Sequence, residues 1–276
     1  MTSLDAVLST VDSWPVSAAA AAVVTPAGVV AAHGPTSTGF PLASVTKPLT
    51  ALAALVAVEE GAVELTDPAD DEVVPGATIR HLLAHASGLA PERPMRSFPP
   101  ATRRVYSNVG INRLAALVEQ AVDMPFAAYL TEAVVSPLRL SSTTLPGSAA
   151  AGGVSTVDDL ARVAHELLAP SGLLHPETLA DATSVQYPGL RGVLPGFGHQ
   201  DPNDWGLGLE IRGTKHPHWT GTRNSPRTYG HFGQSGSMLW IDPDAGVGLV
   251  SLADRAFGEW AALAWPTLAD AVLSAV

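Results

Sequence analysis

The sequence predicts an α+β fold, in which an antiparallel β-sheet is flanked by N- and C-terminal helices and a mainly helical domain is inserted. Strand-forming segments lie towards both ends of the 276-residue chain, whereas its middle is helical and loop-rich. The first two strand candidates are joined by a short turn, which favours antiparallel pairing. We therefore expect residues 1–62 and 188–276 to form a discontinuous sheet domain and residues 63–187 a helical domain. The cleft between them is the expected site.

The N-terminal segment predicts a short helix followed by a hairpin. Apolar residues recur at helical spacing over 4–11, and this helix should end before Pro15. Apolar runs at 18–24 and 29–33 flank the sequence Thr-Pro-Ala-Gly, which is typical of a turn. The two runs should form the first two strands.

The next element should be a buried helix over Ser44–Glu60. Its apolar residues lie on nearly all sides, which is the pattern of a core helix, and Gly61 should end it. Pro48 falls in the first turn, where a missing backbone N–H matters least.

The remaining elements divide between the middle of the chain and its C-terminal part. Ser155 and Asp158 look like a capping pair at the start of a helix. Helices are expected near 79–85, 108–122, 125–134 and 156–168, strands at 205–212, 236–242 and 247–252, and a closing amphipathic helix at 258–276.

Composition narrows the range of functions. The net charge of −11 and the presence of only two lysines disfavour binding to nucleic acid or to an anionic membrane. The chain contains no cysteine, which excludes disulfides, thiolate nucleophiles and cysteine-held metals. The N-terminus lacks the basic start and apolar run of a secretory signal, and no apolar stretch is long enough to span a bilayer. We expect a soluble, cytoplasmic protein.

The strongest chemical motif is Ser44-Val45-Thr46-Lys47, which places a hydroxyl and an amine one helical turn apart. A serine hydroxyl needs a base beside it, and a lysine can serve when burial and nearby positive charge keep its amine neutral. The positive end of the helix would favour an oxyanion near Ser44. The alternative, a capping serine and a solvated lysine, fits less well because Lys47 lies in an otherwise apolar helix.

Two further segments carry polar groups that suit this chemistry. Tyr106 precedes a predicted helix and could exchange protons with Ser44, provided that a nearby ammonium such as Lys47 favours its phenolate. His231 leads into a predicted strand, and Gly233 would let a ligand approach the backbone, with the N–H of Gln234 as an oxyanion donor. Each segment alone would suggest packing rather than catalysis.

In this order, Ser44-Val45-Thr46-Lys47, Tyr106-Ser107-Asn108 and His231-Phe232-Gly233 resemble the serine β-lactamase-like hydrolases, which include class C β-lactamases, D-alanyl-D-alanine carboxypeptidases and esterases. The connecting sequences at 79–89 and 153–160 also resemble that family. The resemblance implies an acyl-enzyme on Ser44, proton transfer by Lys47 and Tyr106, and a substrate hydrogen bond from Asn108. It implies an oxyanion hole formed by the N–H groups of Ser44 and Gln234, and no cofactor.

The third motif departs from the β-lactamases, in which it usually begins with a lysine that binds the substrate carboxylate. His231 is mostly neutral at pH 7 unless its pKa is shifted. We therefore expect a small-molecule ester or amide without a carboxylate as the substrate. β-Lactam or D-alanyl-D-alanine peptide hydrolysis is the alternative, and a non-catalytic penicillin- or peptide-binding module is an alternative of another class.

Histidine pairs elsewhere suggest little. His81 and His85 have the spacing of a metal pair on a helix, but no acidic third ligand is near them in the sequence. His216 and His218 lie in a predicted loop, for which we expect no catalytic role. We expect no metal site.

Overall fold

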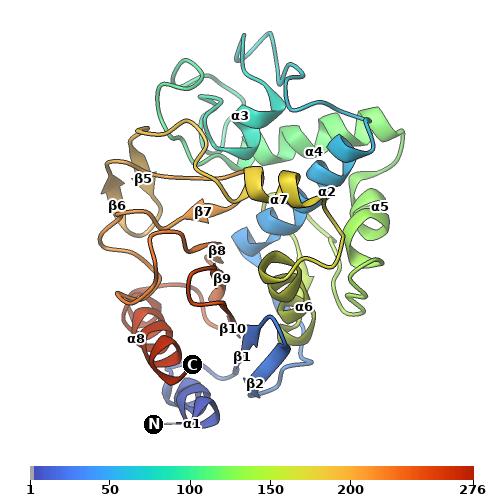
Figure 1. The fold of residues 1–276 in the computed structure, drawn as a ribbon. Helices are drawn as coiled ribbons and strands as arrows, with labels where there is room; N and C mark the ends of the chain where they lie inside the picture. Colours follow the sequence, from blue (N-terminus) through green and yellow to red (C-terminus); the bar gives the residue numbers. More distant parts are fainter. Residues whose placement is uncertain (1–2) are drawn as a thin grey trace.

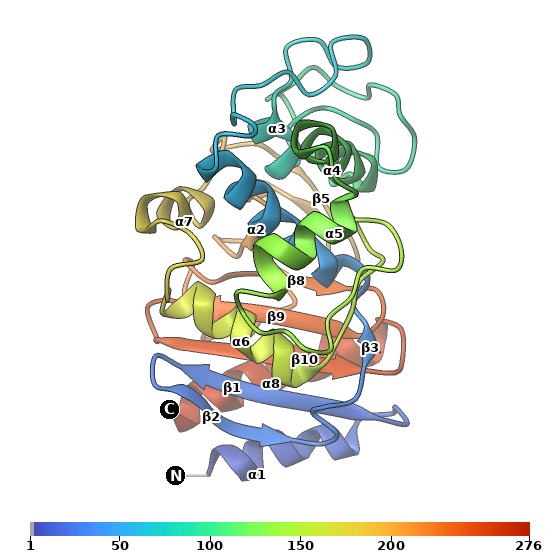
Figure 2. The same ribbon diagram turned by 90° about the vertical axis from the view of Figure 1, so that its right-hand side faces the viewer.

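The computed structural model describes residues 3–276 and confirms the α+β fold. A six-stranded sheet has the order β2-β1-β10-β9-β8-β7, and each neighbouring pair is antiparallel. The strands are β1 (Ala19–Thr25), β2 (Gly28–His33), β7 (Glu210–Ile211), β8 (Tyr229–Gly233), β9 (Ser237–Asp242) and β10 (Val247–Ala253). The N-terminal hairpin thus pairs with the last strand of the chain, as Figures 1 and 2 show.

The central strands β1, β8, β9 and β10 are buried along almost their whole length because both faces of the sheet are covered. In β1, Ala20, Ala22 and Val24 face one core cluster, whereas the alternate residues face the other. One face is covered by α1 (Leu4–Leu8) and α8 (Glu259–Ala275), and the other by α6 (Val157–Leu168). Figure 2 shows α6 in front of the sheet and α8 behind it.

The helical part of the molecule packs around α2 (Thr46–Glu59), which is buried along most of its length. It contacts α4 (Asn108–Val122), α5 (Phe126–Leu130) and the π-helical turn η3 (Thr131–Val135). The expected helix at 125–134 is therefore α5 continued by this wider turn. The remaining helices are η1 (Ser9–Ser13), η2 (Ala43–Val45), α3 (Ile79–Leu83) and α7 (Pro176–Ala182).

Two predicted details were wrong. The strand expected at 205–212 is only β7, because Gly208 turns the chain with a φ of +77° and approaches α2 so closely that a Cβ would lie 2.1 Å from the Cβ of Ala51. The helix cap expected at Ser155 is formed by Thr156, whose hydroxyl accepts from the N–H of Asp159 3.1 Å away.

The strand β8, two short strand pairs and the helix α7 were not predicted. β3 (Phe40–Pro41) pairs with β4 (Val154–Ser155), and β5 (Gly192–Leu194) pairs with β6 (Gly198–Gln200). The first pair holds the segment that precedes Ser44, and the second borders the pocket described below. Within residues 3–276, no helix combines the length and apolar character needed to cross a membrane.

Candidate active site

Ser44 lies in the 3₁₀ turn η2, directly before α2. The turn is fixed from two sides, because the Ser237 hydroxyl donates to the Leu42 carbonyl at 2.6 Å and the Gly153 N–H donates to the Thr46 hydroxyl at 2.9 Å. Ala43 has a φ of +43°, an uncommon conformation for a residue with a side chain. The packing therefore holds Ser44 at a strained bend at the amino end of a buried helix.

Lys47 is fully buried beside Ser44, as its place in an apolar helix predicted. Its Nζ lies 3.1 Å from Ser44 Oγ, 2.7 Å from Asn108 Oδ1 and 2.9 Å from the Ala150 carbonyl. Burial lowers the pKa of Lys47 from 10.5 to about 7, although the charge of Glu92 opposes the shift. A large fraction of Lys47 is thus neutral at neutral pH.

The three neighbours of Lys47 Nζ fix the direction of proton transfer. A neutral amine has two N–H groups and one lone pair. Asn108 Oδ1 and the Ala150 carbonyl can only accept, so they take both N–H groups. The lone pair then faces Ser44 Oγ, whose proton it can accept.

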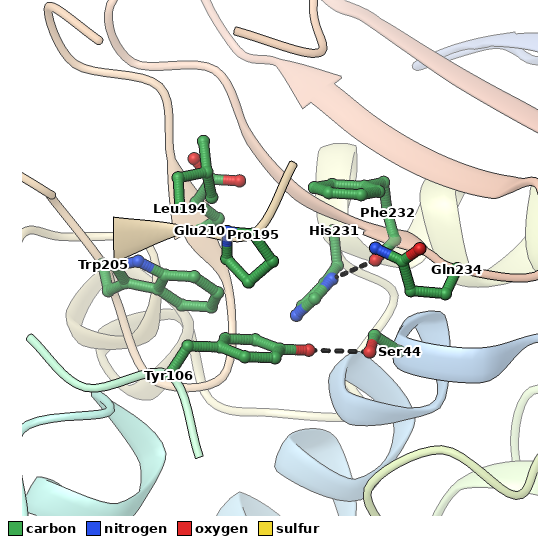
Figure 3. Close-up of a pocket in the computed structure, with 9 residues that line it drawn as sticks. All are labelled: Ser44, Tyr106, Leu194, Pro195, Trp205, Glu210, His231, Phe232 and Gln234. Carbon is green, nitrogen blue, oxygen red and sulfur yellow. Dashed lines mark hydrogen bonds between the residues drawn. The ribbon is translucent and has the colours of Figure 1, made fainter. Parts of the chain in front are cut away.

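Tyr106 lies in the segment that leads into α4, and its hydroxyl donates to Ser44 Oγ at 2.7 Å (Figure 3). Its ring packs against those of His85 and Trp205, which also contact each other, and Lys47 Nζ lies 4.6 Å from the ring centre. The condition stated for a phenolate is not met, since burial raises the pKa of Tyr106 further than its hydrogen bond to Ser44 lowers it. Tyr106 is a proton donor in this arrangement.

Asn108 connects Lys47 to Glu92, a residue that no sequence motif indicated. While Oδ1 accepts from Lys47, its Nδ2 donates to Glu92 Oε1 at 2.7 Å. The hydroxyl of Ser107 caps the same helix by accepting from the N–H of Gly110. With both ends of its amide engaged, Asn108 orients Lys47 in this structure, whereas the resemblance implied a contact with substrate.

His231 lies within β8 and not merely before a strand, and it is 3% exposed. Its Nδ1 donates to the Phe232 carbonyl at 2.7 Å, so Nε2 carries a lone pair. Within the described residues 3–276, Nε2 has no hydrogen-bond partner. Burial and the charge of Lys47 lower the pKa of His231 to about 3, so the ring is neutral near pH 7.

Gly233 allows β8 to approach Ser44. A Cβ on Gly233 would lie 2.2 Å from the Leu42 carbonyl and 3.1 Å from the Ser44 nitrogen. In residues 3–276, no backbone carbonyl accepts from the N–H of Ser44 or of Gln234. Both N–H groups are therefore free to bind a carbonyl oxygen of a substrate.

Ser44 opens onto two spaces. A small inner pocket of about 30 Å³ lies beneath the β5–β6 hairpin and is mainly apolar (Figure 3). It is lined by Ser44, Tyr106, Leu194, Pro195, Trp205, Glu210, His231, Phe232 and Gln234. A larger groove of about 540 Å³ runs outward past Asn108, Phe98 and Val193. Ser44, Tyr106, Pro195 and Gln234 border both spaces.

A buried ionic network supports the inner pocket, and the sequence did not indicate it. Glu210 Oε1 lies 2.9 Å from Lys215 Nζ and 2.8 Å from His218 Nε2, while its Oε2 accepts from Trp219. Lys215 and these hydrogen bonds lower the pKa of Glu210 despite burial. His218 is thus structural. Both lysines of the chain are buried, Lys47 beside Ser44 and Lys215 in this network. The feature of the sequence that could have indicated a buried Lys215 is that lysine occurs only twice in the chain.

The other histidine pair does not converge on one point. His81 Nδ1 accepts from the N–H of Thr78 at 3.1 Å at the start of α3, whereas His85 Nδ1 accepts from the N–H of Ser107 at 3.2 Å beneath Tyr106. Burial lowers the pKa of both imidazoles. These contacts give each histidine a packing role.

The chain is similar to proteins described as a beta-lactamase, an esterase and a penicillin-binding protein. The Beta-lactamase family profile matches residues 12–273. A crystal structure described as a beta-lactamase from Mycobacterium bovis is 55% identical and superposes with a TM-score of 0.95, covering 97% of this chain and 98% of that one. Esterase EstB of Burkholderia gladioli is 25% identical, covering 84% of this chain and 81% of the esterase. Penicillin-binding protein 4* of Bacillus subtilis is 29% identical, but the match spans only 39% of this chain and 31% of that protein.

Proposed function

The chain belongs to the Beta-lactamase family, and on this premise we propose that it hydrolyses small esters or amides through an acyl-enzyme on Ser44. The single observation that carries this proposal is the arrangement around Ser44 Oγ. One neighbour, Lys47, presents a lone pair to it, and the other, Tyr106, donates a proton to it. A nucleophile with an acceptor and a donor on its two sides suits acyl transfer.

In the proposed reaction, the Ser44 proton passes to Lys47 Nζ as Oγ bonds to the substrate carbonyl carbon. The oxygen gains negative charge, which the N–H groups of Ser44 and Gln234 stabilise. When the carbon–oxygen bond to the leaving alcohol breaks, Tyr106 donates its proton to that alcohol and recovers one from Lys47. Water then attacks the acyl-enzyme and gives one proton to Lys47, and Lys47 passes it to Ser44 Oγ as the bond from the acyl carbon to Oγ breaks.

The inner pocket suits the acyl group and the outer groove the leaving group. The alcohol must depart while the acyl group remains on Ser44, and the groove is the wider of the two exits. The small size of the inner pocket favours short acyl chains. His231 offers a lone pair and no positive charge there, so it disfavours an acyl group that carries a carboxylate.

β-Lactam hydrolysis is the second candidate, favoured by the name of the 55% identical Mycobacterium bovis protein. Parallel rates on 4-nitrophenyl acetate and on nitrocefin separate the two, with Ser44→Ala as the control for both. We expect ester turnover that Ser44→Ala abolishes, and weak or no nitrocefin turnover. Strong nitrocefin hydrolysis without esterase activity would overturn the proposal.

We infer in addition that the substrate is a small molecule held by the inner pocket and the outer groove. We also infer that the protein is cytoplasmic and that it acts on neither nucleic acid nor a membrane. The free oxyanion donors and the intact proton pathway favour an enzyme over a non-catalytic binding module. A module without catalysis would bind a penicillin reversibly, whereas an enzyme of this design acylates Ser44. Gel fluorescence with a fluorescent penicillin distinguishes a covalent adduct from reversible binding.

A further inference from the structure

We propose that the outer groove is a subsite for an apolar leaving group that ends in an anion, and that Arg103 binds this anion. This rests on the proposed function only in taking Ser44 as the reacting residue. Three features of the groove support this subsite: its apolar walls, its unpaired cation and its continuity with Ser44.

The walls of the groove expose large apolar side chains to solvent. Val193 is 58% exposed and Phe98 is 39% exposed, and both line the groove together with Pro91, Val105 and Pro195. These residues come from the connection between α3 and α4 and from the β5–β6 hairpin, so their meeting is a product of the fold. Exposed apolar surface that borders a catalytic serine is suited to an apolar part of a substrate.

Arg103 is the cation within this apolar surface. Its guanidinium lies over the Phe98 ring, 5.2 Å from the ring centre, which fixes the side chain in the groove. Across residues 3–276, Arg103 forms neither an ion pair nor a side-chain hydrogen bond, whereas Arg80, Arg113 and Arg227 are paired with carboxylates. Its donors are free for a carboxylate or phosphate.

The other charges of the groove do not cancel Arg103. Arg104 is buried, and its guanidinium donates to the carbonyls of Asn203, Gln186, Tyr187 and Ala84, so it adds positive charge without being free to contact a ligand. Glu92 is the carboxylate that lines the groove, and Asn108 already donates to it. With two cations and one anion, the groove is positive on a chain of net charge −11.

The anion site thus differs in place from the lysine that usually opens the third motif of the family. His231 presents an acceptor to the inner pocket, and Arg103 presents donors to the outer groove. The expectation of a substrate without a carboxylate is thereby limited to the acyl part, which is short and uncharged, whereas the alcohol part is apolar and acidic.

Binding can be measured without catalysis by NMR titration of Ser44→Ala. The probes are 3-(4-hydroxyphenyl)propionate and its uncharged amide. We expect the acid to bind about five- to tenfold more tightly, the range of one partly exposed charge-assisted contact. Arg103→Ala in the Ser44→Ala background should remove this difference. Arg96→Ala is the matched control, since it removes one charge from the same loop outside the groove, and it should preserve the difference. Equal affinities, or a preference that survives Arg103→Ala, would overturn the subsite.

The acetyl esters of the same two phenols then test catalysis on wild-type protein. We expect a higher kcat/KM for the acidic ester and loss of that preference in Arg103→Ala. Selective binding with no hydrolysis of either ester would support the subsite and overturn the proposed function. Hydrolysis of both esters at one rate, with equal binding of the two phenols, would overturn the subsite alone.

Discussion

The rate of the proposed reaction should follow one ionisation near pH 7, that of Lys47. Only the neutral amine has a lone pair for the Ser44 proton, and burial lowers its pKa to about 7. The other groups around Ser44 do not titrate in this range. The pKa of His231 is about 3, that of His85 lies well below its usual value, and that of Tyr106 is raised.

The size of the effect follows from the fraction of neutral amine. With a pKa of about 7, roughly one tenth of Lys47 is neutral at pH 6, about half at pH 7 and about nine tenths at pH 8. We expect kcat/KM to rise about tenfold from pH 6 to a plateau above pH 8. Without the burial of Lys47, the rising limb of the plot of kcat/KM against pH would lie near pH 10, and the rate would still be rising at pH 9.

The assay is hydrolysis of 4-nitrophenyl acetate between pH 6 and pH 9, corrected for the reaction of Ser44→Ala. Because the charge of Glu92 raises the pKa of Lys47, Glu92→Gln should move the limb to lower pH. Glu72→Gln, which removes an exposed carboxylate that does not line the groove, should leave the limb in place. A rate independent of pH over this range, or a limb near pH 10, would refute the role given to Lys47.

Three other changes test separate parts of the site. Tyr106→Phe keeps the buried ring and removes the donor to Ser44, so kcat should fall about 10²- to 10⁴-fold without a change in thermal unfolding; a smaller loss would exclude Tyr106 as the proton donor. Gly233→Ala places a Cβ 2.2 Å from the Leu42 carbonyl, so turnover should fall about 10²-fold or more through displacement of the Ser44 and Gln234 N–H groups; normal turnover would contradict that geometry. Lys47→Met should abolish turnover and change the pH dependence of stability. Folding lowers the pKa of Lys47, so the unfolded chain binds more protons from about pH 7 to pH 10.5, and wild-type stability rises with pH there. The stability of Lys47→Met relative to wild type should be about 3 kcal/mol greater at pH 7 than at pH 10 by urea unfolding, and a difference near zero would contradict the buried amine.

Sequence patterns predicted β1, β2, β9 and β10, because these strands are largely apolar. They missed the central strand β8, because Tyr229–Gly233 contains two glycines and a histidine and is not an apolar run. The apolar residues over 205–212 led to a wrong strand prediction. They lie in a turn at Gly208 that packs against α2, and they are not part of a long strand. The β5–β6 hairpin was missed because its strands are three residues long and half exposed. Such short pairs depend on tertiary contacts rather than on local preference.

The sequence identified the residues of the site more readily than it identified which of them donate and which accept protons. Ser44 and Lys47 are one turn apart on adjoining helical turns, so their contact follows from spacing. The donor role of Tyr106 depends on burial among His85 and Trp205, which spacing does not reveal. The contact of Glu92 with Asn108 and the network around Glu210 join segments distant in the chain, so only the fold brings them together.

The most direct test of the central claim is intact-protein mass spectrometry after brief reaction with 4-nitrophenyl acetate, followed by peptide mapping. Acyl transfer through Ser44 predicts one acetyl group on the peptide that contains Ser44, its disappearance as hydrolysis completes, and its absence from Ser44→Ala. A lasting adduct on another residue, or full turnover by Ser44→Ala, would contradict Ser44 as the nucleophile.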